Sequence, residues 1–277
     1  MRVLRNAGLA FGALVVGSVL FCAVFAELLM PHDPFAQDLT RRLLPPFWME
    51  GHDPAHLLGT DQLGRDYLSR LILGARISML IGVTAVIVSG LIGITIGVIG
   101  GFFGGRVDDV VMFIITTRLA IPLILVALAV VSLVGSSLTV VVLTLGLLLW
   151  DRFAVVARTT TMQVRTLDYV SAAWAAGCSR AWILGREVLP NILSPLAVVA
   201  TLEMALAILL EAVLSFLGLG VPPPLPSWGL MISEGKEYMF FDPWVIFVPG
   251  ITLFVLVMGI NLLGDGLRDM VGASQVR

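Results

Sequence analysis

Lysine is almost absent from this chain, since Lys236 is the only one in 277 residues. A P-loop requires the pattern G-x-x-x-x-G-K-[ST], whose lysine contacts the phosphates of a bound nucleotide. Glu237 follows Lys236, so this pattern does not occur. The chain is therefore not predicted to bind ATP or Mg²⁺ itself, and any process driven by ATP needs a second chain that carries the ATPase.

Charge and cysteine are also scarce. Only 13% of the residues are charged, and the formal net charge is −2, which argues against a nucleic-acid partner. The two cysteines, Cys22 and Cys178, lie in a hydrophobic run and in a polar stretch respectively, so neither a disulfide nor a cysteine metal site is predicted. No catalytic motif is present, and we expect no enzymatic activity in this chain.

All three histidines lie between residues 31 and 76. His52 and His56 have the spacing of two metal ligands on one helical face, but Pro54 between them disfavours the helix that would align them. The sequence therefore predicts no metal site.

Long hydrophobic runs are abundant. Hydrophobic residues make up 58% of the chain, and the mean hydropathy is +1.00, far above that of a soluble domain. Six runs are long enough to cross a bilayer: 7–30, 77–99, 110–133, 136–157, 192–216 and 244–263. A cleavable signal peptide ending at residues 24–26 is the alternative for the first run, but its apolar core is too long for one. An all-α, polytopic membrane protein with six transmembrane helices is predicted.

Three regions follow from these runs. Residues 1–30 form an N-terminal transmembrane helix, residues 31–76 an extracytoplasmic loop, and residues 77–277 a core of five further helices. Within the loop, Thr60 or Asp61 can cap a short helix that carries Arg65, Asp66 and Arg70. These charges fit either a solvated helix surface or a substrate contact. The core contains two long connections, at 165–190 and 217–243.

The arginine distribution orients the chain. With the N-terminus in the cytoplasm, ten arginines fall inside and six basic residues outside, which fits the positive-inside rule. The inner set is Arg2, Arg5, Arg106, Arg152, Arg158, Arg165, Arg180, Arg186, Arg268 and Arg277, and the outer set is Arg41, Arg42, Arg65, Arg70, Arg76 and Lys236. Both termini and residues 165–190 are thus predicted to be cytoplasmic.

A stripe of small residues marks the second run. Ser89, Gly93, Gly97 and Gly101 recur every four residues, so they share one helical face and allow another helix to approach closely.

The stretch 168–191 does not read as a simple connector. Its first part favours helix, Gly177 can end that helix in a left-handed conformation, and Ser179 can begin a second one. Val170, Trp174, Gly177 and Ala181 then fall near one face. An apolar patch with charged edges usually binds a partner. An amphipathic helix on the bilayer surface is the alternative.

Several motifs together resemble a known family, the permease subunits of ABC importers, and among them the C-type permeases for dipeptides, oligopeptides and nickel. The motifs are SAA (171–173) with Gly177 and Leu189-Pro190, which resembles the "EAA" coupling loop; GTDQLGRDYLSR (59–70); LSFLGLGVPPPLPSWGLMISEGKEYM (214–239); and NLLGDGLRD (261–269). The sequence departs from the pattern at Ser171, where the family usually has Glu.

The resemblance implies a multi-pass inner-membrane permease that works with a second related permease, two ATPase subunits and an extracytoplasmic solute-binding protein. The cytoplasmic coupling helix, between transmembrane helices 4 and 5, would contact the ATPase. The residues implied in this contact are Asp168, Val170, Ser171, Ala172, Ala173, Trp174, Gly177, Ala181, Leu189 and Pro190. Closure of the ATPase would move this segment and the attached helices as rigid bodies.

Glu203 and Glu211 in the fifth run are candidates for the substrate pathway. An ionisable group inside a membrane costs free energy, so it usually occurs where it has a function. Arg118 is a conceivable partner of Glu203. The alternative is a hydrogen-bonded glutamate that holds two helices together. Dipeptides or short oligopeptides are the expected substrates, with nickel, glutathione or another small solute as alternatives. A secondary transporter that uses Glu203 as an ion site is the rival from a different class, and it would need no coupling loop.

Overall fold

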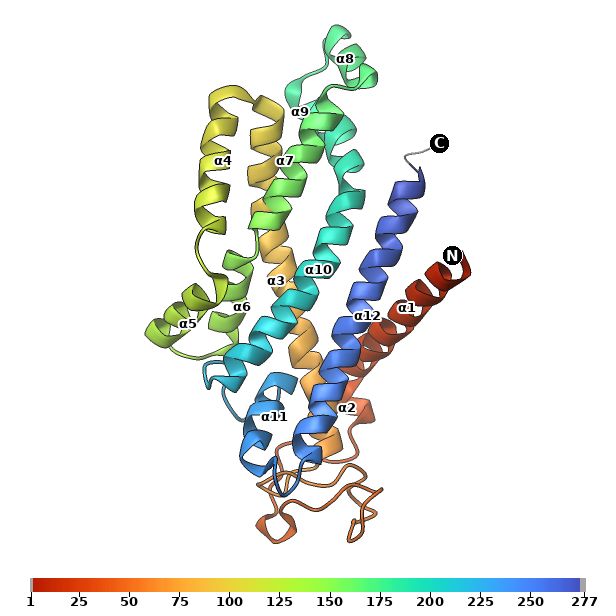
Figure 1. Ribbon diagram of the computed structural model, residues 1–277, viewed down its shortest axis with the longest axis vertical. Coiled ribbons are helices and arrows are strands. Elements are labelled where there is room, and N and C mark those ends of the chain that lie inside the picture. Colours follow the sequence, from red (N-terminus) through yellow and green to blue (C-terminus); the bar gives the residue numbers. More distant parts are fainter. Residues whose placement is uncertain (1, 275–277) are drawn as a thin grey trace.

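The computed structural model describes residues 2–274 and is helical throughout its regular structure (Figure 1). Its elements are α1 (Arg2–Val24), α2 (Ala26–Leu29), η1 (Leu39–Arg41), α3 (Tyr67–Phe103), α4 (Gly105–Leu119), α5 (Leu123–Val134), α6 (Leu138–Leu148), α7 (Asp151–Arg165), α8 (Asp168–Ala175), α9 (Arg180–Ile183), η2 (Leu184–Val188), α10 (Leu189–Phe216), α11 (Trp228–Gly235), η3 (Lys236–Tyr238) and α12 (Trp244–Ser274). Of the arginines used to orient the chain, Arg277 lies outside the described residues, as do the side chains of Arg2 and Arg5.

The apolar runs form membrane-spanning helices. Five segments are long and apolar enough to cross a bilayer: Ala7–Val24, Tyr67–Phe103, Leu138–Arg165, Arg180–Phe216 and Trp244–Met270. The pair α4 and α5 passes the same test together and is bent by 78°, which gives up to six spans if the pair is one broken span. Pro122 lies at this break with an extended ψ of 114°. Proline also lacks the N–H that a continuous helix needs at this position. The prediction of an all-α, polytopic protein is confirmed.

The molecule is elongated, with different features at its two ends (Figure 1). One end carries α8, and the C-terminal half of α12 points toward it; we call it the α8 end. The opposite end, here the loop end, is formed by residues 31–66 and α11. Helix α3 has 37 residues and is therefore about 55 Å long, which exceeds the roughly 30 Å of a hydrocarbon core. It starts at Tyr67, so the last ten residues of the predicted loop are helical instead.

Helix α7 packs against α3 along the predicted stripe of small residues. A methyl group added at Gly93, Gly97 or Gly101 would collide with backbone atoms of α7 or of Trp150 just before it. The colliding carbonyl oxygens belong to Trp150, Ala154 and Arg158, which have the same four-residue spacing. The prediction of a close helix contact at this stripe is confirmed.

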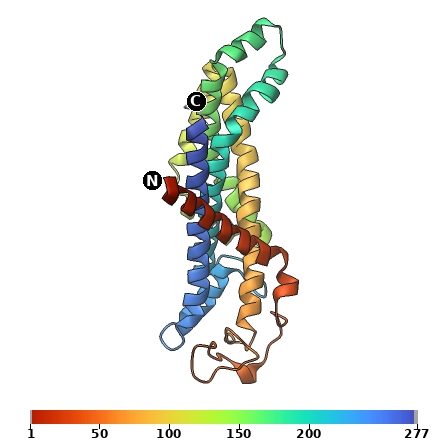
Figure 2. The ribbon, with the colours of Figure 1, turned by 90° about the vertical axis from the view of Figure 1, so that its right-hand side faces the viewer.

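Helix α1 crosses the surface of α12 obliquely (Figure 2). At the crossing, a Cβ atom added at Gly12 would lie 2.6 Å from the carbonyl oxygen of Gly259, so the two backbones nearly touch. Arg76 of α3 fixes the end of α1, because its Nε donates to the carbonyl oxygen of Ala23 (2.8 Å) and its Nη1 pairs with Glu27 (2.8 Å).

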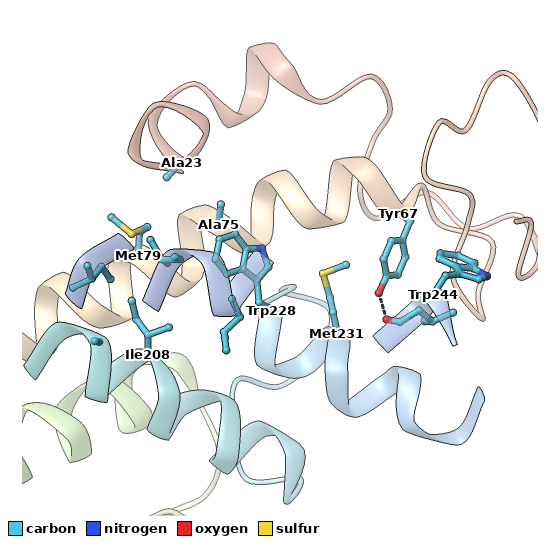
Figure 3. Close-up of a cluster of buried hydrophobic side chains, with 13 residues drawn as sticks. Ala23, Tyr67, Ala75, Met79, Ile208, Trp228, Met231 and Trp244 are labelled. Carbon is cyan, nitrogen blue, oxygen red and sulfur yellow. Dashed lines mark hydrogen bonds between the residues drawn. The ribbon is translucent and has the colours of Figure 1, made fainter. Parts of the chain in front are cut away.

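A buried cluster near the loop end joins α3, α11 and α12 (Figure 3). The Tyr67 hydroxyl donates to the carbonyl oxygen of Val245 (2.5 Å), and its ring packs edge-on against Trp244. Trp228 donates its indole N–H to the carbonyl oxygen of Leu71 (2.9 Å). Ser227 caps α11 as the sequence predicted, with its Oγ accepting from the amide of Leu230 (3.1 Å).

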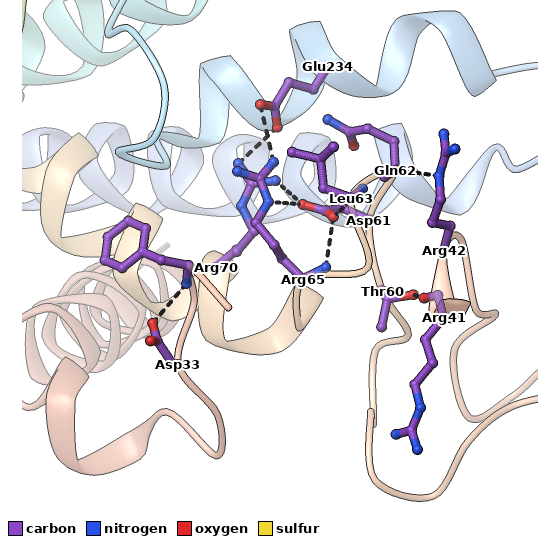
Figure 4. A network of polar contacts seen from close by, with 11 residues as sticks. Asp33, Arg41, Arg42, Thr60, Asp61, Gln62, Leu63, Arg65, Arg70 and Glu234 are labelled. Atoms are coloured by element: carbon purple, nitrogen blue, oxygen red, sulfur yellow. Dashed lines mark hydrogen bonds and ion pairs between the residues drawn. The ribbon is translucent and has the colours of Figure 1, made fainter. Parts of the chain in front are cut away.

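The charges of the GTDQLGRDYLSR motif are buried, which contradicts the prediction of a solvated helix surface (Figure 4). Asp61 pairs with Arg65 (Nε to Oδ2, 2.7 Å) and with Arg70, and Arg70 also pairs with Glu234 of α11 (Nη2 to Oε2, 2.8 Å). The predicted short helix is wrong. Asp61 instead closes a turn by accepting from the amides of residues 63 and 65, and Asp66 caps α3.

Candidate coupling and translocation sites

Helix α8 forms the tip of the α8 end (Figure 1). Val170 is fully buried in a cluster with residues of α3, α7 and α10, including Phe102 and Ile192. It therefore cannot contact a partner, and we correct its predicted place on the docking face. The exposed members of the predicted set are Asp168, Ser171, Ala172, Trp174, Gly177, Ala181, Leu189 and Pro190, and Ala173 is half-buried.

The turn after α8 is built as the sequence predicted. Gly177 has a φ of +80°, the left-handed conformation in which a side chain is strained, and no atom of the part of the chain that the structure describes would lie within 4 Å of an added Cβ. Ser179 then caps α9, because its Oγ accepts from the amide of Trp182 (3.3 Å). Leu189 and Pro190 lie in the first turn of α10, where proline needs no partner for its missing N–H.

Aromatic and cationic contacts attach this tip to the end of α3. The ring of Trp174 stacks on Phe102 at 6.2 Å with an interplanar angle of 25°. Arg180 lies over the ring of Phe103 (5.9 Å), and Arg165 donates to the carbonyl oxygen of Phe102 (2.9 Å). A force applied to α8 would therefore reach α3 through packed rings as well as α7 and α10 through the chain.

Tyr169 sits beside the predicted contact residues on α8 and is 41% exposed. Partial burial, with a smaller contribution from the negative charge of Glu187, raises the pKa of the Tyr169 phenol. Its hydroxyl is thus neutral at physiological pH and can donate a hydrogen bond.

Glu203 is fully buried in the middle of α10 and pairs with Arg152 of α7. Its Oε1 lies 3.3 Å from Nη1 of Arg152, although neither carboxylate oxygen has a hydrogen-bond partner among the described residues. The predicted partner, Arg118, instead donates to the carbonyl oxygen of Leu148 at the end of α6. That carbonyl is one of those left free where α6 stops, so Arg118 compensates a helix break.

A cavity of about 260 Å³ lies beside this ion pair. It is lined by Arg118, Leu119, Ile121, Pro122, Leu123, Leu149, Asp151, Arg152, Glu203 and Leu206. Two helix breaks meet there, between α4 and α5 and between α6 and α7. In membrane transporters, broken helices commonly mark a substrate site, because their free backbone groups need polar partners. The cavity brings two acidic and two basic side chains to one place.

Glu211 has a different environment. Its Oε1 accepts hydrogen bonds from the hydroxyls of Ser215 and Ser227, both at 2.7 Å. Since Ser227 also caps α11, these bonds tie α10 to α11, and Glu211 does not line the cavity of Glu203. The contacts favour the structural alternative for this residue.

The chain belongs to an established family of membrane components. The family of binding-protein-dependent transport system inner membrane components matches residues 93–275, which include α8 and the cavity residues. The N-terminal transmembrane domain of oligopeptide transport permease C matches residues 1–46. These matches place the chain among the permease components of binding-protein-dependent transport systems.

Similar proteins narrow the relationship further. The chain is 42% identical to the di/tripeptide transport system permease protein DppC of Pseudomonas aeruginosa, over 96% of this chain and 88% of that protein. It is 41% identical to the dipeptide transport system permease protein DppC of Escherichia coli K12, with the same coverage. Among solved structures, the MetNI methionine ABC transporter in an inward-facing conformation has a similar fold, with a TM-score of 0.60, 18% identity, and coverage of 74% of this chain and 95% of that one.

Sequence reasoning overlooked the role of Arg152. In the sequence its charge serves only to orient the chain, and nothing in its spacing from Glu203 relates the two. One signal was available: Asp151 and Arg152 are charged residues inside an apolar region, and such residues usually face a partner or a cavity.

Proposed function

We propose that this chain forms one half of the translocation pathway of an ATP-driven importer for dipeptides or short oligopeptides. The other half is a second, related permease; two ATPase subunits bind on the cytoplasmic side, and a solute-binding protein delivers substrate from outside. Both termini and α8 are cytoplasmic, and the loop end is extracytoplasmic. The chain itself does not hydrolyse ATP, and the partner ATPases bind ATP and Mg²⁺. The names of the relatives and the scarcity of lysine support this proposal.

The observation that carries the substrate class is the mixed charge of the cavity. Asp151 and Glu203 offer negative charge, and Arg118 and Arg152 offer positive charge, around one space. A peptide with free termini carries one charge of each sign. Glu203 has no hydrogen-bond partner among the described residues, so it can accept from a passing ammonium group. The single pairing with Arg152 keeps that attraction weak and reversible.

Coupling to the ATPase uses the outward face of α8. Ser171 and Ala172 are exposed there, and the buried Val170 on the opposite face anchors the helix to the permease. The contact at Ser171 would lack the ion pair that a glutamate could form, so docking would depend on shape and apolar area. Movement of α8 would pass into α7 and α10, which carry Arg152 and Glu203. The coupling segment and the cavity thus share the same two helices.

The test is peptide uptake into vesicles that contain the whole transporter. Glu203→Gln removes the charge while keeping size and hydrogen bonding, and Glu237→Gln, at an exposed position on η3, is the matched control. We expect Glu203→Gln to lower ATP-dependent uptake of a labelled dipeptide by at least about tenfold, the value of one charge-assisted hydrogen bond of about 1.5 kcal/mol. Assembly and the affinity of the binding protein should not change.

Other outcomes distinguish the alternatives. Normal uptake in both Glu203→Gln and Glu203→Ala would show that the residue only packs the helices. ATP-dependent accumulation of nickel or glutathione but not of peptides would keep the transporter class and change the substrate. Uptake driven by an ion gradient without the ATPases would instead support a secondary transporter.

A further inference from the structure

Two histidines and an aspartate that are far apart in the sequence meet at the loop end. His32 lies shortly after α2, His56 comes from the middle of the loop, and Asp66 caps α3. One ligand atom of each lies within 4.8 Å of the others, and among the described residues this is the one such group. The pair singled out from the sequence was His52 and His56, but His52 is exposed and its ring contacts the carbonyl oxygen of Met49 instead.

The separations suit a metal ion. The Oδ1 atom of Asp66 lies 2.8 Å from Nδ1 of His56 and 3.6 Å from Nδ1 of His32. The centroids of the two imidazole rings are 4.8 Å apart. Tetrahedral Zn²⁺ holds nitrogen and oxygen ligands at about 2.0–2.2 Å, which places them about 3.3 Å from one another. The existing distances lie on both sides of that value. Small rotations of the two rings, which sit on loops, would bring all three atoms into place.

Neighbouring groups already orient the ligands. The second carboxylate oxygen of Asp66 accepts from the amide of Ser69 (2.8 Å), and the hydroxyl of Ser69 accepts from the amide of His32 (3.1 Å). Such outer contacts fix the ligands of natural metal sites. Asp66 is almost fully buried, whereas the side chain of His32 is 38% exposed, so an ion has a route in and water can occupy a fourth position.

We propose that His32, His56 and Asp66 bind one divalent transition-metal ion, for which Zn²⁺ is best suited. Two imidazoles and one carboxylate favour zinc over Mg²⁺ or Ca²⁺, which prefer oxygen ligands. The ion would join two separate segments of the loop, at His32 and His56, to the N-cap residue of α3, Asp66. It is a structural ion and is distinct from whatever the transporter carries, because none of its three ligands lines the cavity of Glu203.

The test is Zn²⁺ binding to the full chain, co-purified with its partner permease in nanodiscs without a polyhistidine tag. Competition with a fluorescent zinc chelator should show one ion per chain. His32→Ala and His56→Ala should each weaken binding by at least about 10- to 100-fold, the loss typical even of outer-shell partners. Asp66→Asn should also weaken it while preserving the helix cap, since asparagine caps nearly as well as aspartate. His52→Ala is the matched control in the same loop and should bind normally.

Two further readouts keep the result interpretable. Co²⁺ in the same site should give the intense visible absorption of a tetrahedral complex, and His56→Ala should abolish it. Circular dichroism and a monodisperse elution profile check that each variant is folded. The proposal is overturned if the unaltered chain shows no saturable Zn²⁺ binding, if folded His56→Ala binds as tightly as the unaltered chain, or if His52→Ala removes binding. The first result would leave the contact between His56 and Asp66 as a hydrogen bond alone.

Discussion

Gly97→Ala tests whether the contact between α3 and α7 limits stability. The added methyl carbon would lie 2.8 Å from Cβ of Ala157 and 2.9 Å from the amide nitrogen of Arg158. Carbon atoms in contact are normally about 3.5–4.0 Å apart, so the helices would have to separate by about 1 Å. Overpacking of this kind costs about 1–3 kcal/mol of unfolding free energy. Two of the three nearest atoms, the carbonyl oxygen of Ala154 and the amide nitrogen of Arg158, belong to the backbone and cannot rotate away.

The control for this change is Gly17→Ala in α1, where no atom of the described residues lies within 4 Å of the added carbon. Alanine favours a helix over glycine by roughly 0.5–1 kcal/mol at both positions, so the difference between the two variants isolates the packing cost. Unfolding in mixed detergent micelles, followed by helical circular dichroism, measures both. Gly97→Ala should be less stable than Gly17→Ala by about 1–3 kcal/mol.

Equal stability of the two variants would refute this reasoning. It would mean that α7 can shift without loss and that the glycine stripe does not set the helix separation.

Three other predictions concern the tip and the loop end. Gly177→Val should lower the unfolding free energy by about 1–2 kcal/mol, because valine is strained at a left-handed φ, and it should uncouple ATP hydrolysis from uptake in the whole transporter. The control is Gly185→Val, at a position with no positive φ and open space around it, which should retain coupling. Equal coupling in both variants would contradict the assignment. Asp61→Asn should lower the unfolding free energy by about 3–5 kcal/mol in the micelle assay, because it leaves buried arginines sharing one carboxylate, and a loss below about 1 kcal/mol would show that Glu234 suffices. Ser179→Cys, in a background without the native cysteines, should resist an impermeant thiol reagent added to intact cells and react after permeabilisation; ready labelling from outside would reverse the proposed topology.

The features that depend on neighbouring residues in the sequence were predicted correctly. Gly177 has the left-handed φ expected of it, Ser179 and Ser227 cap their helices, and the small residues of α3 mark a close contact. Each of these depends on neighbours within about four positions, so spacing alone reveals it. Hydrophobic length likewise determined the membrane-spanning class, since a run of about 20 apolar residues has few other uses.

Pairings between distant segments required the tertiary structure. From the sequence, the candidate partner of Glu203 was Arg118, and the candidate partner of His56 was His52. In the fold, Arg152 lies beside Glu203, and His32 lies beside His56. The same holds for Val170: the sequence predicted that it lies on a helix, but only the structure shows that its side chain is buried.

The sequence by itself determined that this chain is a helical membrane protein, which glycine and serine residues end or begin its short helices, and which stretch protrudes between the fourth and fifth spans. Only the tertiary structure decided which charges meet, which face of α8 is free, and that Glu211 ties α10 to α11 while Glu203 lines a cavity. The physical reason is that periodicity and capping act over one or two helical turns. Charge pairing and burial depend on the relative positions of helices, which the order of residues along one helix does not encode.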